Sequence, residues 1–388
     1  TAGMVATGGS AGRLGSTSGV DLSAGAVLQL NTSETINLLT GGGSVVLNGT
    51  AVRLTTGTDN GDYVLGNVVS GTGTFTKTGT GSVTLAGTST YTGDTTLTNG
   101  TIRLGSDDAL GNAVSSYLLV TAGRLSSDGA TSRSLGNNIT MNGDLSLGSA
   151  TNTGRVTLAG GISLEGFNRT FTVDSVATIS GLLANGAITK AGASTLTLTA
   201  ANTYGATTIN QGRIVVSGAG SLGTSGTITL NGGPIADSLL PGTRLTLDNT
   251  TTASSVRLGT RRVDFFGGHL ELLGSSGTAV TEALTTDQHL AVTTSHNVIT
   301  LDNNGANLRI TTSGAGTLTS SNLATLFLRG DALGQAAGAT NTNIILATTT
   351  APTNWMTVVG QGGANAAANK QIFPWAVADT SATSSGTT

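Results

Sequence analysis

Two stretches of the sequence share one pattern: GTGTFTKTGTGSVTLAGTSTYTGDTTLTNGTIRLGSDDALG (71–111) and NGAITKAGASTLTLTAANTYGATTINQGRIVVSGAGSLG (185–223). Aligning them superposes three marks of one copy on three marks of the other: Lys77, Tyr91 and Gly100 on Lys190, Tyr204 and Gly212. The chain has 388 residues but only four tyrosines and three lysines, so chance does not explain this coincidence. We infer an internal repeat, which is the signature of a repetitive architecture.

Within each copy, short segments alternate apolar and polar residues. SVTLAGT (82–88) and STLTLTA (194–200) are clear examples. This period of two, rich in Thr, Val, Leu and Ile, predicts half-buried β-strands. Gly, Asn and Asp between the strands supply the positive-φ positions of tight corners. The alternation predicts an inward set and an outward set: Val83, Leu85, Leu196 and Leu198 inward, Thr84 and Thr197 outward.

The composition decides between the all-β folds. Thr and Gly make up a third of the chain, and aromatic residues are only 3%. A sandwich or barrel would need bulkier core residues, whereas a right-handed parallel β-helix stacks narrow coils of Val, Leu, Ile, Ala and Thr. We therefore predict an all-β fold, a right-handed parallel β-helix (β-solenoid), with roughly 15–20 coils of about 20 residues each.

The C-terminal region differs from the rest in composition. Alternation weakens there, and both tryptophans, Trp355 and Trp375, fall in it together with two prolines. We predict a β-solenoid over residues 1–325 and a terminal cap or separate small β-rich module over 326–388.

Charge and cysteine content exclude several classes of protein. Charged residues are 10% with a net charge of −3, and no basic stripe exists to follow the phosphates of a nucleic acid. No apolar run approaches the length of a membrane span. Without cysteine there are no disulfides, thiolate nucleophiles or cysteine-ligated zinc sites. The chain begins at Thr1 and carries no signal peptide, so we expect an excised or processed stretch of a longer chain.

The two copies resemble the autotransporter-associated β-strand repeat, whose pattern combines a Lys, a Tyr and regularly spaced glycines. Copy one has Ser89 where that family favours Asn, and copy two has Ser194 and Ala200 at two glycine positions. Copy two also lacks the glycine that follows the tyrosine in the pattern. The resemblance covers about a fifth of the chain.

This resemblance implies a β-helical stalk in a secreted passenger region or in a very large surface protein of a Gram-negative bacterium. It implies an extracellular location and a non-catalytic, structural function. The partners expected from it are neighbouring solenoid segments or further copies of the chain, and surface carbohydrate is a further candidate.

Few residues along the chain are candidates for catalysis or ligand binding. The densest group of ionisable residues is Arg261, Arg262, Asp264, His269 and Glu271. Strand alternation places Arg262 and Asp264 on one face, and His269 and Glu271 on one face further along. We interpret the group as solvated outward residues and neutralising pairs, and predict no catalytic residue.

Metal and cofactor sites are not expected either. His289 and His296 have no carboxylate at metal-ligand spacing, and Asp107-Asp108 is replaced by Ala219-Gly220 in copy two. We interpret the aspartate pair as polar caps of a corner and predict no bound cofactor.

The repeat marks allow two interpretations. Lys77/Lys190 and Tyr91/Tyr204 form either an exposed ligand-contacting stripe or structural positions, with Tyr packed over a corner and Lys guarding exposed strand backbone. We favour the structural interpretation. Trp355 and Trp375 are weak candidates for a sugar-stacking platform.

Three alternatives to the stalk remain open at this stage. They are an adhesin that binds carbohydrate on its side face, a polysaccharide-cleaving β-helix with a groove of carboxylates, and self-assembly into a filament through open solenoid ends.

Overall fold

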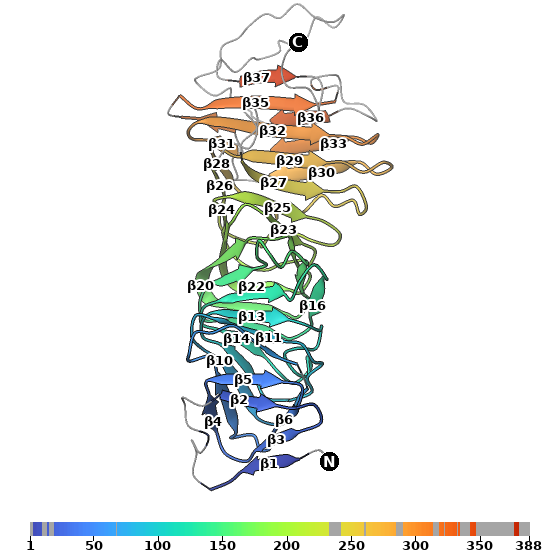
Figure 1. Cartoon of the computed structure of the whole chain (residues 1–388). Coiled ribbons are helices and arrows are strands. Elements are labelled where there is room, and N and C mark those ends of the chain that lie inside the picture. Colours follow the sequence, from blue (N-terminus) through green and yellow to red (C-terminus); the bar gives the residue numbers. More distant parts are fainter. Residues whose placement is uncertain are drawn as a thin grey trace, which may run out of the picture. The chain divides into compact units, whose positions relative to one another are not determined.

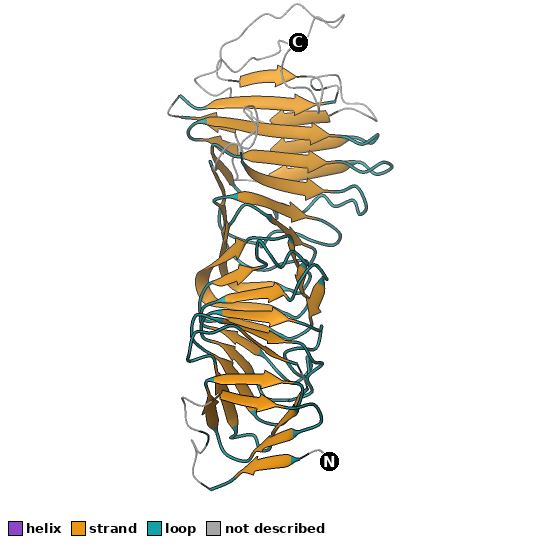
Figure 2. Ribbon diagram, in the orientation of Figure 1, coloured by secondary structure: helices purple, strands orange, loops and turns teal. Residues whose placement is uncertain are grey.

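The computed structural model describes residues 3–9, 14, 19–66, 68–232, 242–259, 261–284, 290–312, 318–321, 323–331, 333, 342–346 and 376–379. Strands and loops make up this described part, with no helix (Figure 2). None of these residues belongs to a helix with the length and apolar character that crossing a bilayer demands. The chain divides into two compact units, Thr1–Tyr204 (unit 1) and Gly205–Thr388 (unit 2).

The strands of unit 1 have three or four residues, as frequent corners require, except Ile162–Val173 with 12 residues and Leu183–Ala191 with 9 (Figure 1). They are β1 Met4–Thr7, β2 Gly19–Leu22, β3 Val27–Leu30, β4 Glu34–Ile36, β5 Leu38–Gly41, β6 Ser44–Leu47, β7 Arg53–Thr56, β8 Tyr63–Leu65, β9 Val69–Gly71, β10 Thr74–Lys77, β11 Ser82–Leu85, β12 Thr95–Leu97, β13 Thr101–Leu104, β14 Leu118–Val120, β15 Arg124–Ser127, β16 Arg133–Leu135, β17 Ile139–Met141, β18 Leu145–Leu147, β19 Val156–Leu158, β20 Ile162–Val173, β21 Ala177–Ile179, β22 Leu183–Ala191 and β23 Thr195–Leu198.

The described strands of unit 2 continue the numbering. They are β24 Thr207–Ile209, β25 Gly212–Val216, β26 Ile228–Asn231, β27 Thr243–Asp248, β28 Val263–Phe266, β29 His269–Leu273, β30 Val280–Leu284, β31 Leu290–Val292, β32 His296–Asp302, β33 Leu308–Thr312, β34 Leu318–Ser320, β35 Thr325–Gly330, β36 Thr342–Leu346 and β37 Ala376–Asp379.

Each strand pairs in parallel with the strand one coil away. In unit 1 one ladder runs β4-β7-β10-β12-β14-β17-β20-β22 and a second runs β2-β5-β8-β11-β13-β15-β18-β20. The third face holds β1-β3-β6-β9 and β16-β19-β21-β23. Unit 2 has three comparable ladders, β24-β26-β28-β31-β34, β25-β27-β29-β32-β35-β37 and β30-β33-β36. The fold is thus the predicted β-solenoid.

The described residues form about 12 turns rather than the 15–20 expected. Coils of unit 1 need about 20 residues, as the pairing of Phe75 with Thr95 shows. Coils of unit 2 are longer, since Ile228 pairs with Val263 and Leu308 with Thr342. Longer loops between strands therefore account for the smaller number of turns.

Inward side chains stack in columns along the coils. Val83, Leu85, Leu196 and Leu198 are all buried, as the alternation predicts. Thr197 is partly exposed, but Thr84 is only 8% exposed. Its ladder partners Val64 and Arg103 carry larger side chains on either side, which accounts for the low exposure.

Parallel pairing continues beyond residue 325. β35 pairs with both β32 and β37, and β36 pairs with β33. Most residues after 346 lie outside the described part, so a cap or module over 326–388 stays a prediction.

Leu118 and Leu119 offer a matched test of the inward column. Leu118 is fully buried between Thr95 and Ile139 of the adjacent coils, whereas Leu119 faces outward and is partly exposed. We expect Leu118→Ala to lower the free energy of unfolding by about 2–5 kcal/mol. Leu119→Ala should cost less than about 1 kcal/mol, as outward substitutions usually do. Urea unfolding followed by circular dichroism compares the two, and equal losses would contradict the assigned register.

Candidate functional site

The two repeat lysines lie inside the coils. Lys77 ends β10, Lys190 lies near the end of β22, and neither side chain is exposed. Lys77 Nζ donates to the carbonyl oxygens of the next two residues, Thr78 at 2.5 Å and Gly79 at 3.1 Å. Lys190 Nζ does the same, as Ala191 O accepts at 2.7 Å and Gly192 O at 2.5 Å. Each ammonium group therefore caps the corner that follows its own strand.

This placement corrects both interpretations of the lysines. They are neither an exposed ligand-contacting stripe nor guards of exposed strand backbone. The chain turns at Gly79 and Gly192, whose φ angles are +69° and +76°, and the lysine satisfies carbonyl oxygens at that turn. Buried carbonyl groups need donors, and a charged donor makes a stronger hydrogen bond than a neutral one. The alternation of the strand indicates that Lys77 points inward, because it is two residues from the inward Phe75.

Gly100 covers the Lys77 cap from the following coil. Its φ is +75°, and a Cβ atom there would lie 2.4 Å from Gly79 O and 2.7 Å from Lys77 Nζ. The repeat glycine is thus required both by backbone conformation and by the space that the ammonium group occupies. Gly212, its counterpart in copy two, also has a positive φ of +72°.

Burial lowers the pKa of both repeat lysines. Desolvation lowers the pKa of Lys190 to about 8, and Asp174 opposes this shift. Desolvation also lowers the pKa of Lys77, where Asp59 and Asp62 oppose it. A group buried in a narrow coil is charged less readily than in water.

The repeat tyrosines are buried as well. Tyr91 Oη lies 2.5 Å from Thr95 Oγ1, and burial raises the pKa of this phenol far above its usual value. A Cβ atom on Gly111 would lie 3.0 Å from the Tyr91 ring, so the tyrosine packs against a corner, as the structural interpretation expects. Tyr204 is 1% exposed.

The position where copy one departs from the repeat pattern keeps its function in the structure. Asn202 Oδ1 accepts the backbone N–H of Leu183 at 2.9 Å. Ser89, the aligned residue, is buried, and its Oγ accepts the backbone N–H of Val69 at 3.4 Å. Both side chains tie their segment to the preceding coil.

Two arginines perform the capping function in unit 2. Arg257 is fully buried and donates to Asn249 Oδ1 and to the carbonyl oxygens of Gly218, Gly220 and Thr252 at 2.6–3.1 Å. No periodic pattern in the sequence points to Arg257, because it lies in the loop between β27 and β28.

Arg261 is the second of these arginines and is 2% exposed. Its guanidinium donates to the carbonyl oxygens of Gly223, Gly226 and Thr227 and to Thr207 Oγ1 at 3.1–3.3 Å. The interpretation of Arg261 as a solvated surface residue is therefore wrong. The carbonyl oxygens of a neighbouring coil hold it inside.

The remaining members of the ionisable group separate onto two sheets. Arg262 Nε donates to Asp264 Oδ1 at 2.5 Å on the exposed side of β28, as alternation predicts. His269 and Glu271 belong to β29 in another sheet. Glu271 faces outward, but His269 is only 1% exposed and is not a solvated residue.

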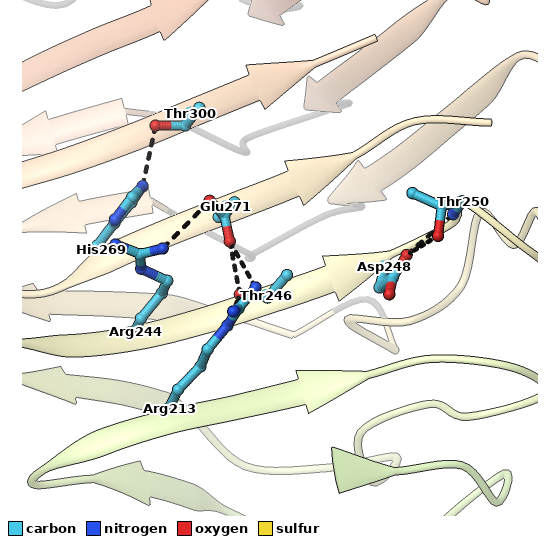
Figure 3. A network of polar contacts seen from close by, with 8 residues as sticks. All are labelled: Arg213, Arg244, Thr246, Asp248, Thr250, His269, Glu271 and Thr300. Atoms are coloured by element: carbon cyan, nitrogen blue, oxygen red, sulfur yellow. Dashed lines mark hydrogen bonds and ion pairs between the residues drawn. The ribbon is translucent and has the colours of Figure 1, made fainter. Parts of the chain in front are cut away.

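Glu271 joins three consecutive coils of unit 2 (Figure 3). Its carboxylate accepts from Arg213 Nη2 at 2.9 Å on β25, from Arg244 Nη1 at 3.4 Å on β27, and from Thr246 Oγ1 at 2.8 Å. Arg213 Nε also donates to Thr246 at 2.7 Å. A carboxylate held by two guanidinium groups links the coils that carry them.

His269 lies beside this network. Its Nε2 is 2.9 Å from Thr300 Oγ1, and its Nδ1 has no hydrogen-bond partner among the described residues. Desolvation holds its pKa well below the usual value, and Arg244, Arg329 and Arg213 lower it further. The imidazole is therefore neutral at physiological pH.

Aspartates of unit 1 act as links between coils. Each accepts, through Oδ1, a backbone N–H one coil further along at 2.7–2.9 Å: Asp62 from Ser82, Asp94 from Tyr117, Asp107 from Ser134 and Asp144 from Thr170. Asp107 is thus a corner cap, as predicted. For Asp62 the hydrogen bonds from Ser82 lower the carboxyl pKa.

The other candidates give no site in the described part of the chain. No three His, Asp or Glu side chains come together there as metal ligands would. His296 Nδ1 lies 3.3 Å from Thr325 Oγ1. His289, Trp355 and Trp375 lie outside the described residues.

Glu282 of β30 is a buried carboxylate. It is 2% exposed, and its two oxygens accept the backbone N–H groups of Arg257 at 3.1 Å and Leu258 at 3.2 Å. Desolvation raises its pKa to about 7, opposed by these hydrogen bonds and by the charge of Arg257.

Lys190→Met should change how stability depends on pH. Because the folded-state pKa is about 8 and the ordinary value is 10.5, the unfolded state binds more protons between these values. The contribution of Lys190 to stability is therefore present above pH 10.5 and is lost as pH falls through 8. We expect the wild type to gain on the order of 3 kcal/mol relative to Lys190→Met between pH 8 and pH 10.5. Thermal melting across this range measures the difference, and parallel curves would refute the assigned pKa.

Glu282→Gln should have the opposite signature. Its folded-state pKa of about 7 lies above the ordinary 4.5, so its contribution to stability is present below pH 4.5 and is lost as pH rises through 7. We expect the wild type to lose on the order of 3 kcal/mol relative to Glu282→Gln between pH 4.5 and about pH 8. Hydrogen exchange of peptides covering β30, measured at both ends of the range, reports the change locally. A wild type with the same pH dependence as the variant would count against a buried titrating carboxyl.

A comparison with known protein families matches the two segments that contain the lysine caps. A family model described as passenger-associated-transport-repeat matches residues 75–104 and 188–216. No curated protein and no solved structure gives a significant match. Each matched segment contains its buried lysine, its buried tyrosine and its positive-φ glycine. The chain is a β-solenoid that carries two passenger-associated transport repeats.

Proposed function

We propose that this chain is a non-catalytic structural segment, a stalk or fibre element, of a secreted bacterial cell-surface protein. The observation that carries the proposal is the use of the repeat residues. The coils are capped and packed by Lys77, Tyr91, Gly100 and their counterparts. A load-carrying scaffold needs such internal contacts. The family match supports the same conclusion, because its repeat is named for the transported passenger region.

The use of the ionisable groups also favours a structural function. Asp62, Asp94, Asp107 and Asp144 accept backbone N–H groups, and Glu271 is held by two arginines. Hydrolysis of a glycosidic bond generally needs two carboxyl groups facing each other across the substrate. The described carboxylates named here are engaged in linking coils, and this supports a scaffold over a polysaccharide-cleaving enzyme.

Surface display tests the proposal. The chain would be fused between a secretion signal and an autotransporter translocator and expressed in a Gram-negative host. We expect the wild type to reach the surface as a protease-resistant segment. Lys77→Met with Lys190→Met should lower the resistant amount several-fold, because each change leaves two corner carbonyls without their donor. Arg53→Gln, a change at an exposed position of β7, is the matched control and should behave as wild type.

A second measurement separates a scaffold from an enzyme. The purified chain would be incubated with neutral and acidic polysaccharides, and new reducing ends and unsaturated products would be assayed. We expect none. Turnover that is abolished by Glu271→Gln, while the protein remains folded, would overturn the non-catalytic proposal.

A further inference from the structure

One corner of unit 1 departs from the pattern of tight turns. In the coil that contains β17 and β18, the chain runs from Ile139 to Leu145 between two ladders. In the next coil, which contains β20, it runs from Ile162 to Phe171 between the same two ladder positions and so holds extra residues there. The register of β20 against β22 shifts between Ser163 and Phe167. This β-bulge widens the coil, and bulges commonly redirect side chains at functional positions.

The backbone of the bulge is held in an unfavourable conformation. Glu165 has a φ of +55° and Gly166 of +79°, and on the neighbouring strand Asn185 has +59° and Gly186 +149°. Two of these four are not glycine, and such residues are uncommon at positive φ. A Cβ atom on Gly186 would lie 2.3 Å from Phe167 O, so the two strands depend on each other's shape. Strain of this kind concentrates at binding sites.

The bulge presents an aromatic ring to solvent. Phe167 is 62% exposed in a chain where the other described phenylalanines are mostly inward. Arg169 Cζ lies 4.8 Å from the centre of the Phe167 ring, so a guanidinium group covers one face of it. Arg169 Nε is itself buried and has no hydrogen-bond partner in the described part. The stacking fixes the ring while leaving its other face open, which reduces the entropy lost on binding.

Polar side chains on and next to the bulge are linked by hydrogen bonds. Ser163 Oγ donates to Glu165 Oε1 at 2.6 Å, and Asn185 Nδ2 donates to Ser163 Oγ at 3.4 Å. Asn168 exchanges hydrogen bonds with Thr189 of the next coil at 3.0 and 3.2 Å. Glu165, Asn168 and Asn185 are exposed, so the bulge that carries the exposed ring also offers carboxylate and amide groups to solvent.

We propose that the bulge formed by Glu165–Arg169 and Asn185 is a binding site for a neutral glycan, with a sugar ring stacked on the open face of Phe167. A sugar presents a C–H face that suits an aromatic ring and hydroxyl groups that suit carboxylate and amide partners. The charges of Glu165 and Arg169 balance, which favours an uncharged ligand over an anionic one. The single exposed ring is too small an apolar area for a stable protein interface.

The adjoining sheet face can extend the contact. Thr140 of β17 and Ser163 of β20 lie in register, and both are partly exposed. These two hydroxyl groups lie on adjacent coils, at about the 4.8 Å spacing of parallel strands, and the column continues with Leu119 on one side and Ala184 on the other. A glycan stacked on Phe167 and lying along the coils would therefore meet hydroxyl partners on these two coils. This site is independent of the structural function proposed above.

Affinity electrophoresis of the full chain tests the site. Native gels would be cast with β-glucan, galactomannan or xyloglucan as neutral probes and with dextran sulfate as an anionic probe. We expect retardation by at least one neutral polysaccharide and none by dextran sulfate. Phe167→Ala should weaken the retardation about tenfold or more, and Phe167→Trp should retain it. Arg169→Gln should weaken it less, because the ring remains but is no longer fixed.

Two controls keep the result interpretable. Tyr117→Ala removes another exposed aromatic side chain of unit 1, 46% exposed, and should leave retardation unchanged. Thermal melting should be the same for wild type, Phe167→Ala and Tyr117→Ala, since both side chains are exposed. Absence of retardation by every neutral probe, equal loss in Phe167→Ala and Tyr117→Ala, or stronger binding to dextran sulfate would each overturn the proposal.

Discussion

The corners of a β-solenoid set the main constraint on this chain. Parallel ladders pair the backbone groups of the strands, but carbonyl oxygens at a turn have no strand partner and lie where the coil is too narrow for bulk water. Four buried cations supply the missing donors at the corners named here: Lys77, Lys190, Arg257 and Arg261. Several carbonyl groups share one side chain, which limits the number of charges that must be taken out of water.

The need to cap corners explains where many of the few charged residues of this chain are used. Charged residues are only 10% of the chain, and many of those named here bind backbone groups. In unit 1, aspartates link coils from the N–H side while lysines cap corners from the carbonyl side. Glycine completes the arrangement, as at Gly100, where a side chain would occupy the space of the Lys77 ammonium group.

The fold and the repeat can be predicted from the sequence, but the buried cations that cap the corners cannot. The inward positions of Val83, Leu85, Leu196 and Leu198 follow from a period of two, because burial of one face fixes the register. Lys77 obeys the same parity as Phe75, yet a lysine is expected outside because burying an unpaired charge is costly. Its carbonyl partners belong to its own turn, and no pattern in the sequence displays them. Arg257 and Arg261 lie in a loop, where periodicity gives no direction, and the β20 bulge arises from a difference in length between two coils.

The lysine caps and the arginine caps also differ in what they require during folding. Lys77 and Lys190 bind carbonyls one and two residues ahead, so these hydrogen bonds can form within a single coil. Arg257 reaches Gly220, and Arg261 reaches Gly223, both in an earlier segment of the chain. Local contacts have little loop entropy to overcome and can form early, whereas long-range contacts must wait for the coils they join. A chain that folds coil by coil as it is delivered would benefit from the local kind. The lysine caps belong to the segments that match a transport repeat, and the arginine caps lie outside them.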